Sequence, residues 1–258
     1  MSTTESKPTL YVIRGSHACR TAMLMLDHKG IGYRRVDLPT GLHPFGVRLR
    51  GFPGYPEHVR KLAGRSHRPL AMLDRLGTVP ALRAGSERIQ TNRAIARFLD
   101  RVQPQPPLFP TDPKRRATVE EAERWGDDEL QMTARRLGFA AIQRGREAMH
   151  RRANDGRLGP MLWRSETVRF AAASGIGRIV FDANPDSERE LLAALPPMLD
   201  RIDGLIGAGV LDSEQLNAAD FMIVTSLALL CYRVDLRPEI EARPAGWLLE
   251  RVLPEPAT

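Results

Sequence analysis

The chain is poor in cysteine, with only Cys19 and Cys231 among its 258 residues. One pair of thiols cannot form the disulfide framework that is typical of small secreted proteins. The six histidines show no metal-ligand spacing, and His17 with Cys19 alone would be an incomplete ligand set. The sequence therefore predicts neither a disulfide-stabilised fold nor a metal site.

Long apolar runs are absent as well. The longest, Phe221 to Tyr232, is too short to span a bilayer. Residues Met1 to Pro8 are polar and lack the apolar core of a secretory signal. We therefore expect a cytoplasmic protein that has no membrane partner.

Acidic residues are fewer than basic ones, with 31 against 38, which gives a formal net charge of +7. Such a surplus can attract nucleic acid, anionic lipid or small anions. The basic residues, nearly all arginine, are spread along the chain between acidic ones. No basic stripe interleaved with aromatics, of the kind that binds single strands, is present. We expect no nucleic-acid partner and interpret the arginines as a solvated surface that reflects genome composition.

What the sequence does contain begins with short apolar and amphipathic segments in alternation. Thr9 to Ile13 predicts a buried strand, and a helix follows from Ser16 or His17 to a stop at Gly30. Ile31 to Leu38 predicts a second strand. Together these segments predict a βαβ unit with a parallel pair of strands.

The next segment is less regular. Thr40 to Leu76 is rich in proline and glycine and predicts a long loop that holds one short helix near Glu57 to Leu62. Thr78 to Arg83 and Glu87 to Ile89 flank an Ala-Gly-Ser turn and predict an antiparallel hairpin. Thr91 to Arg101 then predicts a helix with one apolar face.

A proline-rich stretch divides the chain. Gln103 to Pro113, QPQPPLFPTDP, is unsuited to the interior of a helix or sheet. We expect domains at residues 1–103 and 111–258, joined by a linker at 104–110. Pro196-Pro197 is expected to kink or split one of the helices that follow. The predicted helices of the second domain lie within Glu120 to Arg152, Pro160 to Ser174, Ser187 to Ile206, Asn217 to Tyr232 and Ala245 to Val252.

The helix within Asn217 to Tyr232 is nearly uniformly apolar, which predicts that it is buried on most faces. Asn217 stands at its N-cap position, and Asp220 can reach back to the backbone there. This pair predicts a capping box that helps to begin the helix.

In this order the segments resemble the cytosolic glutathione transferase superfamily over nearly the whole chain. Four motifs in the family's order around the proline linker carry the resemblance. It implies a thioredoxin-like α/β N-terminal domain and an all-α C-terminal domain, with the active site between them. The motifs are TLYVIRGSHACRTAMLMLDHKGIGYRRVDL, GTVPAL, IQTNRAIARFLD and LNAADFMIVTSLALL.

The first motif carries the candidate catalytic residues. The resemblance places Ser16 at the family's catalytic Ser, Tyr or Cys, and a hydroxyl at a helix N-terminus can lower the pKa of a bound thiol. Ser16 is equally a good N-cap, so both interpretations stay open. Cys19, one turn later, is either a redox nucleophile or a small buried residue. His17, as a loop imidazole or an acid-base group, and Arg20, as a partner for an anionic group, are candidate substrate-binding residues.

The other motifs supply the remaining candidates. Val79-Pro80 stands where thioredoxin-like folds place a cis-proline, and the resemblance assigns the Val79 backbone to the cysteinyl part of the thiol. Thr91-Asn92 replaces the family's usual Glu or Gln followed by Ser, which binds the γ-glutamyl end of glutathione. Helix-end amides and Asn92 can still bind a carboxylate there. Trp125 is a candidate for an apolar pocket that holds an electrophile.

The resemblance implies an enzyme that activates glutathione, or another low-molecular-weight thiol, as co-substrate for attack on a hydrophobic electrophile. It also implies a role in detoxification, a homodimer and no metal. Two alternatives stay open. One is a thiol-disulfide or deglutathionylating oxidoreductase that uses Cys19, and the other is a non-catalytic ligand-binding protein with the same fold.

Overall fold

The computed structural model describes residues 7–39, 42–53, 79–149, 175, 177–178 and 181–254. The chain consists of two compact units, Met1–Pro106 (unit 1) and Pro107–Thr258 (unit 2). The division between them falls inside the predicted linker at 104–110. Within the described ranges, no helix has the length and hydropathy that a bilayer-spanning segment needs.

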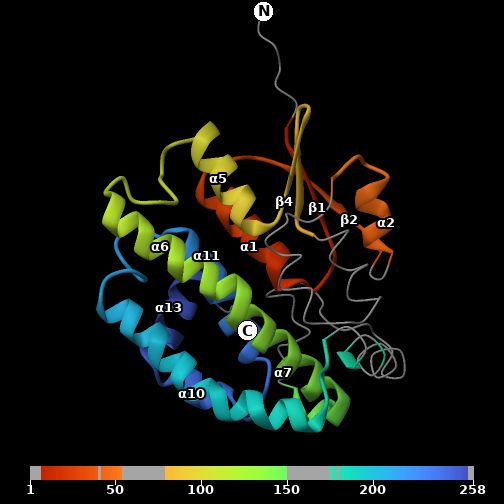
Figure 1. Ribbon diagram of the computed structural model, residues 1–258, viewed down its shortest axis with the longest axis vertical. Helices are drawn as coiled ribbons and strands as arrows, with labels where there is room; N and C mark the ends of the chain where they lie inside the picture. The colour runs from red at the N-terminus through yellow and green to blue at the C-terminus, as the bar shows by residue number, and fades with distance from the viewer. Residues whose placement is uncertain are drawn as a thin grey trace, which may run out of the picture. The chain divides into compact units, whose positions relative to one another are not determined.

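Unit 1 is built on a four-stranded mixed sheet with the strand order β2-β1-β3-β4 (Figure 1). β2 runs parallel to β1, which confirms the predicted βαβ unit. β3 pairs antiparallel with both β1 and β4, which confirms the predicted hairpin. The strands are β1 (Thr9–Val12), β2 (Arg34–Asp37), β3 (Ala81–Ala84) and β4 (Glu87–Gln90).

Helices cover both faces of this sheet. Figure 1 shows α1 (His17–His28) and α5 (Asn92–Val102) on one side and α2 (His43–Arg48) on the other. The paired residues Leu10 and Leu82 are fully buried. Because side chains alternate along a strand, Tyr11 points to the opposite face, where α2 lies.

α2 lies in the segment that the sequence predicted to be a loop. Pro44 stands in its first turn, where the missing backbone N–H leaves no hydrogen bond unmade. The short helix predicted near Glu57 to Leu62 falls outside the described residues, as does the one predicted at Pro160 to Ser174.

A buried ion pair joins the C-terminal ends of α1 and α5. The Lys29 ammonium is fully buried and lies 2.6 Å from Asp100 Oδ1. It also donates to the Gln103 carbonyl at 2.7 Å. Removing an ammonium from water costs several kcal/mol unless a counterion and hydrogen bonds replace the water. The pair therefore determines how α1 and α5 end beside each other.

The described part of unit 2 is helical, as predicted. Its first helical run begins at Pro113, earlier than the predicted Glu120, because Asp112 caps it and proline suits the first helical position. The elements in chain order are α6 (Pro113–Trp125), the π-helical turn η1 (Gly126–Leu130), α7 (Gln131–Arg144), η2 (Arg146–Ala148), α10 (Pro185–Gly207), α11 (Ala218–Leu230), α12 (Arg237–Glu241) and α13 (Pro244–Val252).

α10 continues through Pro196 and Pro197, so of the two expected effects, a kink or a split, the split is wrong. Both prolines are exposed, whereas Leu195 and Leu199 beside them are buried. The carbonyls that lose their hydrogen bonds can thus reach water, while the apolar stripe holds the helix to its neighbours.

α11 is buried along its whole length, as predicted. Its capping box is also confirmed: Asp220 accepts hydrogen bonds from the backbone N–H of Asn217 and of Asp212, each at 2.8 Å. Burial raises the pKa of Asp220 to about 6, although these two hydrogen bonds oppose the shift. Gly126 lets η1 approach α11 closely, because a Cβ there would lie 3.0 Å from Met222.

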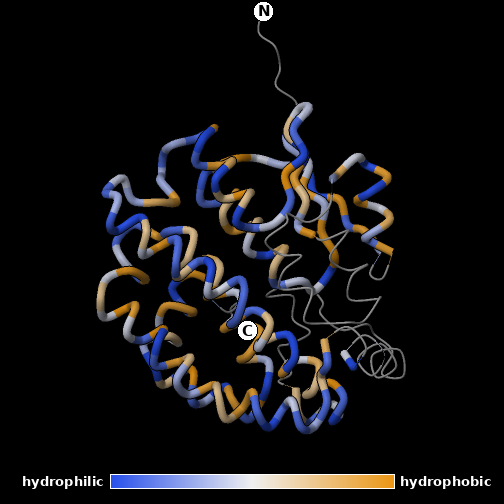
Figure 2. Tube along the Cα trace, in the orientation of Figure 1, coloured by the Kyte–Doolittle hydropathy of each residue, from blue (hydrophilic) through white to orange (hydrophobic). Residues whose placement is uncertain are grey.

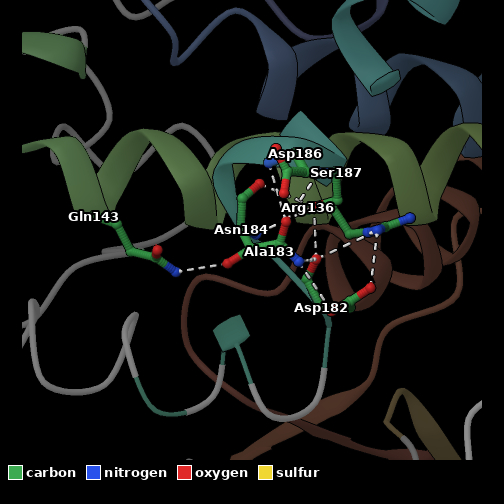
Figure 3. Close-up of polar contacts among 7 residues, drawn as sticks. All are labelled: Arg136, Gln143, Asp182, Ala183, Asn184, Asp186 and Ser187. Carbon is green, nitrogen blue, oxygen red and sulfur yellow. Dashed lines mark hydrogen bonds and ion pairs between the residues drawn. The ribbon is translucent and has the colours of Figure 1, made fainter. Parts of the chain in front are cut away.

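The residues that precede α10 are fixed to α7 by polar contacts (Figure 3). Arg136 donates to the Asp182 carbonyl at 3.3 Å and pairs with the Asp182 carboxylate at 3.5 Å. Gln143 donates to the Ala183 carbonyl, also at 3.3 Å. Asn184 then caps α10 through its side chain.

A second fully buried cation, Arg233, joins α7 to α10. Its guanidinium pairs with Glu188 of α10 at 2.6 Å and with Asp235 at 2.5 Å. It also donates to the Leu137 carbonyl of α7 at 3.2 Å. The hydrogen bond from Arg233 lowers the pKa of Asp235 and keeps this carboxylate ionised.

We predict that Asp220 gives unit 2 a distinctive pH dependence. A carboxyl whose pKa is raised from 3.8 to about 6 by folding binds more protons in the native than in the unfolded state between these values. Its contribution to the free energy of unfolding therefore falls as pH rises from about 4 to about 6, by up to about 3 kcal/mol. Urea unfolding followed by tryptophan fluorescence reports on unit 2, which contains all three tryptophans. The difference between wild type and Asp220→Asn should shrink over this pH range, and a difference that is independent of pH would contradict the prediction.

We predict that unit 1 depends on the Lys29–Asp100 pair. Asp100→Asn leaves the buried ammonium without its counterion and should destabilise unit 1 by about 3 kcal/mol. The matched control, Asp37→Asn, removes the exposed Arg35–Asp37 pair and should cost less than about 1 kcal/mol. Hydrogen exchange of the β1 amides measures both effects. Equal protection in the two variants would show that the buried pair has no special weight.

Candidate active site

One row of the sheet determines which segments of unit 1 come together. Tyr11 of β1 pairs with Ala81 of β3, and Ala81 pairs with Gln90 of β4. Because both pairings are antiparallel, the residues after Tyr11, before Ala81 and after Gln90 all leave the sheet at the same end. The segments that meet at this end contain Ser16, Val79-Pro80 and Thr91-Asn92.

Ser16 stands between β1 and α1. Gly15 has a φ of 73°, which glycine adopts without strain, and turns the chain into the helix. The half-buried Ser16 is the N-cap, and its Oγ accepts a hydrogen bond from the Cys19 N–H at 3.3 Å. The Ser16 hydroxyl donates to no acceptor within the described part of the chain. Its proton is therefore available to a ligand atom at the helix N-terminus.

The neighbours of Ser16 differ in accessibility. The Cys19 side chain is only 2% exposed and forms no disulfide, so its thiol lies inside unit 1. His17 is not a loop residue but the first residue of α1, and it is buried. Arg20 is half-buried, and its Nε has no hydrogen-bond partner within the described residues.

Val79 and Pro80 lie directly before β3 and are both buried. The peptide bond between them is cis, as the resemblance predicts. Because proline has no N–H, it is well suited to the position that precedes the first residue of the β3 ladder.

Thr91 and Asn92 begin α5 in an unusual way. Thr91 has φ 73° and ψ 146°, a conformation that β-branched residues rarely adopt. Its hydroxyl accepts from the Ala94 N–H at 3.2 Å and caps the helix. Asn92 is 3% exposed, and its Oδ1 has no hydrogen-bond partner among the described residues. A buried oxygen without a partner, beside a strained residue, is typical of a ligand site.

Sequence reasoning missed Arg93, the second residue of α5. Its Nε is buried and has no hydrogen-bond partner in the described ranges. Helices commonly begin with acidic residues, which offset the positive end of the helix dipole. The first turns of α1 and α5 contain none. The arginines at these helix starts, Arg20 and Arg93, were the signal in the sequence, and they suit an anionic group.

Trp125 belongs to unit 2, where residues of the same unit hold its indole. The ring is buried, and its N–H donates to Glu129 at 3.1 Å. The Arg201 guanidinium lies 4.6 Å from the ring centroid. Across the described ranges, His, Cys, Asp and Glu form no cluster suited to a metal ion.

Comparison with known proteins adds information on the fold. No protein-family model matches the chain, and no curated protein matches its sequence. Among solved structures, it resembles glutathione transferase GSTFuA3 from Phanerochaete chrysosporium, with a TM-score of 0.64 and 15% identity over 99% of this chain and 100% of that chain. It also resembles the glutathione S-transferase CsGST63524 of Ceriporiopsis subvermispora in complex with glutathione, with a TM-score of 0.63 and 18% identity over 98% of this chain and 100% of that chain.

A bacterial enzyme is similar too. The beta-etherase LigF from Sphingobium sp. strain SYK-6 has a TM-score of 0.53 and 17% identity over 95% of this chain and 100% of that chain. At such low identity these likenesses concern the fold. The thioredoxin-like α/β unit and the all-α unit that follows it have the fold of the glutathione transferases, as the sequence motifs predicted.

Proposed function

We propose that this chain is a glutathione transferase-like enzyme that binds glutathione, or another low-molecular-weight thiol, in unit 1 and activates its sulfur. The observation that carries the proposal is the sheet register, which brings Ser16, Val79-Pro80 and Thr91-Asn92 to one end of the sheet. The N-termini of α1 and α5, which have no acidic residue in their first turns, favour an anionic ligand. The fold shared with glutathione transferases supports the same proposal.

Ser16 is the proposed catalytic residue. A hydroxyl that donates to the sulfur, at the positive end of α1, stabilises the thiolate and lowers the pKa of the bound thiol. The thiol proton passes to water, and a sulfur lone pair forms the new bond to the electrophilic carbon. The leaving group departs with its electron pair. The buried thiol of Cys19 is poorly placed for attack, which favours this reaction over the oxidoreductase alternative.

The N-terminus of α5 is the proposed site for the amino-acid end of the thiol. Helix-end N–H groups and the Arg93 guanidinium suit a carboxylate. The Asn92 Oδ1 is an acceptor without a partner in the described chain, so it suits the ammonium that the missing family Glu would bind. The Val79 backbone would hold the cysteinyl part, and Arg20 would offer a further cation. His17 is too deeply buried to contact substrate and is proposed to support the turn.

The proposal includes the features that the resemblance implies beyond the site. These are a homodimer, a cytoplasmic location, a detoxification reaction and contact of the hydrophobic electrophile with Trp125. The indole of Trp125 is buried and donates to Glu129, so the ring is held in place within unit 2. The non-catalytic alternative shares the thiol site and differs in the absence of turnover.

We predict that Ser16→Gly raises the pKa of bound glutathione and lowers kcat/KM by about 10²-fold, the usual loss when a hydrogen-bond donor to a developing anion is removed. Glycine retains most of the N-cap stability, so the loss reflects the missing hydroxyl. The pH profile of kcat/KM with a general electrophile, and the ultraviolet absorbance of the thiolate, measure these effects.

Two control variants separate the rival reactions. Ser16→Thr keeps a hydroxyl and should retain most of the activity, whereas Cys19→Ala should change kcat/KM by less than about threefold. If Cys19→Ala abolishes turnover and Ser16→Gly does not, the oxidoreductase reaction replaces the transferase reaction.

We predict that Asn92→Ala weakens glutathione binding by about tenfold, because a charge-assisted hydrogen bond contributes about 1.5 kcal/mol or more. Calorimetric titration measures the Kd, and the pKa of the bound thiol should stay unchanged because the Ser16 hydroxyl still contacts the sulfur. Wild type that binds no glutathione at millimolar concentration would overturn the assignment of this thiol. Parallel titration with other biological thiols would then decide whether unit 1 binds a thiol at all.

A further inference from the structure

The basic surplus of the chain lies in one of its two units. Unit 1 contains 18 basic and 7 acidic residues, a formal charge of +11, whereas unit 2 contains 20 basic and 24 acidic residues, a formal charge of −4. The even spread of arginine along the sequence hides this difference, because acidic residues are concentrated after the division. Unit 1 by itself is therefore strongly cationic.

Part of this charge lies in one row on one face of the sheet. Thr9 pairs with Arg34 on one side and with Arg83 on the other, and Arg83 pairs with Arg88. Side chains paired across strands point to the same face. Lys7 precedes Thr9 by two residues, and its side chain lies within 4 Å of the position that a Cβ on Gly32, two residues before Arg34, would take. Lys7, Arg34, Arg83 and Arg88 form what we term the cationic sheet face.

Among the described residues of the sheet, no acidic side chain neutralises this face. Asp37 and Glu87 are the acidic residues of the four strands, and both are displaced by an odd number of positions from the row, so they point to the opposite face. Each is already paired there, with Arg35 and Arg101 respectively. Within the described part of the chain, Lys7, Arg34 and Arg83 have no ion-pair partner.

α2 lies on the same side of the sheet. The residues that follow it cross this face: Phe52 packs edge-on against Tyr11, and Arg50 lies over the Tyr11 ring at 5.3 Å. Arg88 of the cationic sheet face donates to the Arg50 carbonyl at 3.2 Å. The segment Leu42 to Pro53 contains Arg48 and Arg50 and no acidic residue.

α2 presents an apolar stripe to solvent. Leu42, Phe45 and Leu49 are spaced three and four residues apart, so they share one side of the helix. They are 62%, 58% and 86% exposed. Figure 2 shows hydrophobic residues in α2 interrupted by hydrophilic ones. Side chains this exposed project from the surface and do not line a hollow.

We propose that α2 and the cationic sheet face together form a docking surface for an anionic lipid bilayer. Lysine and arginine near such a surface are attracted to the lipid phosphates, and projecting apolar side chains enter the boundary between headgroups and acyl chains. This concerns binding to the membrane surface, which the absence of long apolar runs does not address.

Two features favour a bilayer over other anionic partners. Nucleic acid bound along a sheet is usually held by exposed aromatic rings on which bases stack, and here Tyr11 and Phe52 are buried. A peptide helix that docks onto this chain would need a groove here, whereas Leu42, Phe45 and Leu49 form a projecting ridge. The ridge and the cations together match an interfacial membrane site.

The test is co-sedimentation of the full chain with large vesicles of phosphatidylcholine, with and without phosphatidylglycerol. The chain should bind the anionic vesicles, and binding should weaken with salt, because screening acts on the cationic sheet face. Failure to bind phosphatidylglycerol vesicles at low salt would overturn the proposal.

Two pairs of variants assign the binding to this surface. Phe45→Ser with Leu49→Ser should lower the vesicle partition coefficient by about tenfold. Arg34→Gln with Arg83→Gln should lower it by about thirtyfold, or about fivefold for each cation. The matched controls are Trp247→Ser and Arg115→Gln, which alter an exposed aromatic and an exposed cation of unit 2 and should leave partition unchanged. Circular dichroism establishes that each variant is folded.

Other outcomes would overturn the proposal in identifiable ways. Binding that survives loss of Phe45 and Leu49 would be electrostatic adsorption alone, and duplex DNA would then compete for it. A change of oligomeric state in lipid-free Phe45→Ser with Leu49→Ser, measured by light scattering, would show that a second copy covers the ridge. Glutathione binding should be unchanged in all four variants, so this test and that of the proposed function can fail separately.

Discussion

The antiparallel pairing of β3 with both β1 and β4 is the constraint on which the candidate site depends. Its row of Tyr11, Ala81 and Gln90 determines that the end of β1, the start of β3 and the end of β4 leave the sheet together. A slip of one residue would exchange the two faces of a strand and expose Leu10 or Leu82. The hydrophobic effect that buries these leucines thus also holds the site segments in place, so that stability and function rest on the same register.

The sequence was most informative where a local pattern has one physical solution. Asn217 and Asp220 predicted a capping box because few other arrangements satisfy the first N–H groups of a helix whose sides are all apolar. Ser16 predicted a helix start for the same reason, and the order of the motifs predicted the fold. Local sequence patterns did not predict features that depend on contacts with residues far away in the sequence. Lys29 is buried only because Asp100 meets it there. α2 was missed because it is short and shows no regular core-facing period: Val47 is buried, whereas Phe45 is exposed.

The excess basic residues of unit 1 form separate groups at the two ends of the sheet. At the end with Ser16 and Asn92, Arg20 and Arg93 stand at helix starts that lack acidic residues and favour a small anion. Towards the opposite end, Lys7, Arg34 and Arg83 form a broader surface. The first arrangement contains buried polar atoms without hydrogen-bond partners among the described residues, and it suits a single small ligand. The second contains the exposed Lys7 and Arg34 and the half-buried Arg83, and it suits an extended charged surface. Composition alone does not distinguish them, because the same residue type serves both.

Thr91 shows what a fixed site demands of its scaffold. A β-branched residue held at a φ of 73° stores about 1–3 kcal/mol of conformational energy, which the rest of unit 1 must supply. Glycine would release that energy, yet it would also let the first turn of α5 rotate and widen the range of directions its amides sample. The native state of unit 1 is thus slightly less stable than it could be, and in return the backbone N–H groups in the first turn of α5 keep one fixed direction before a ligand binds.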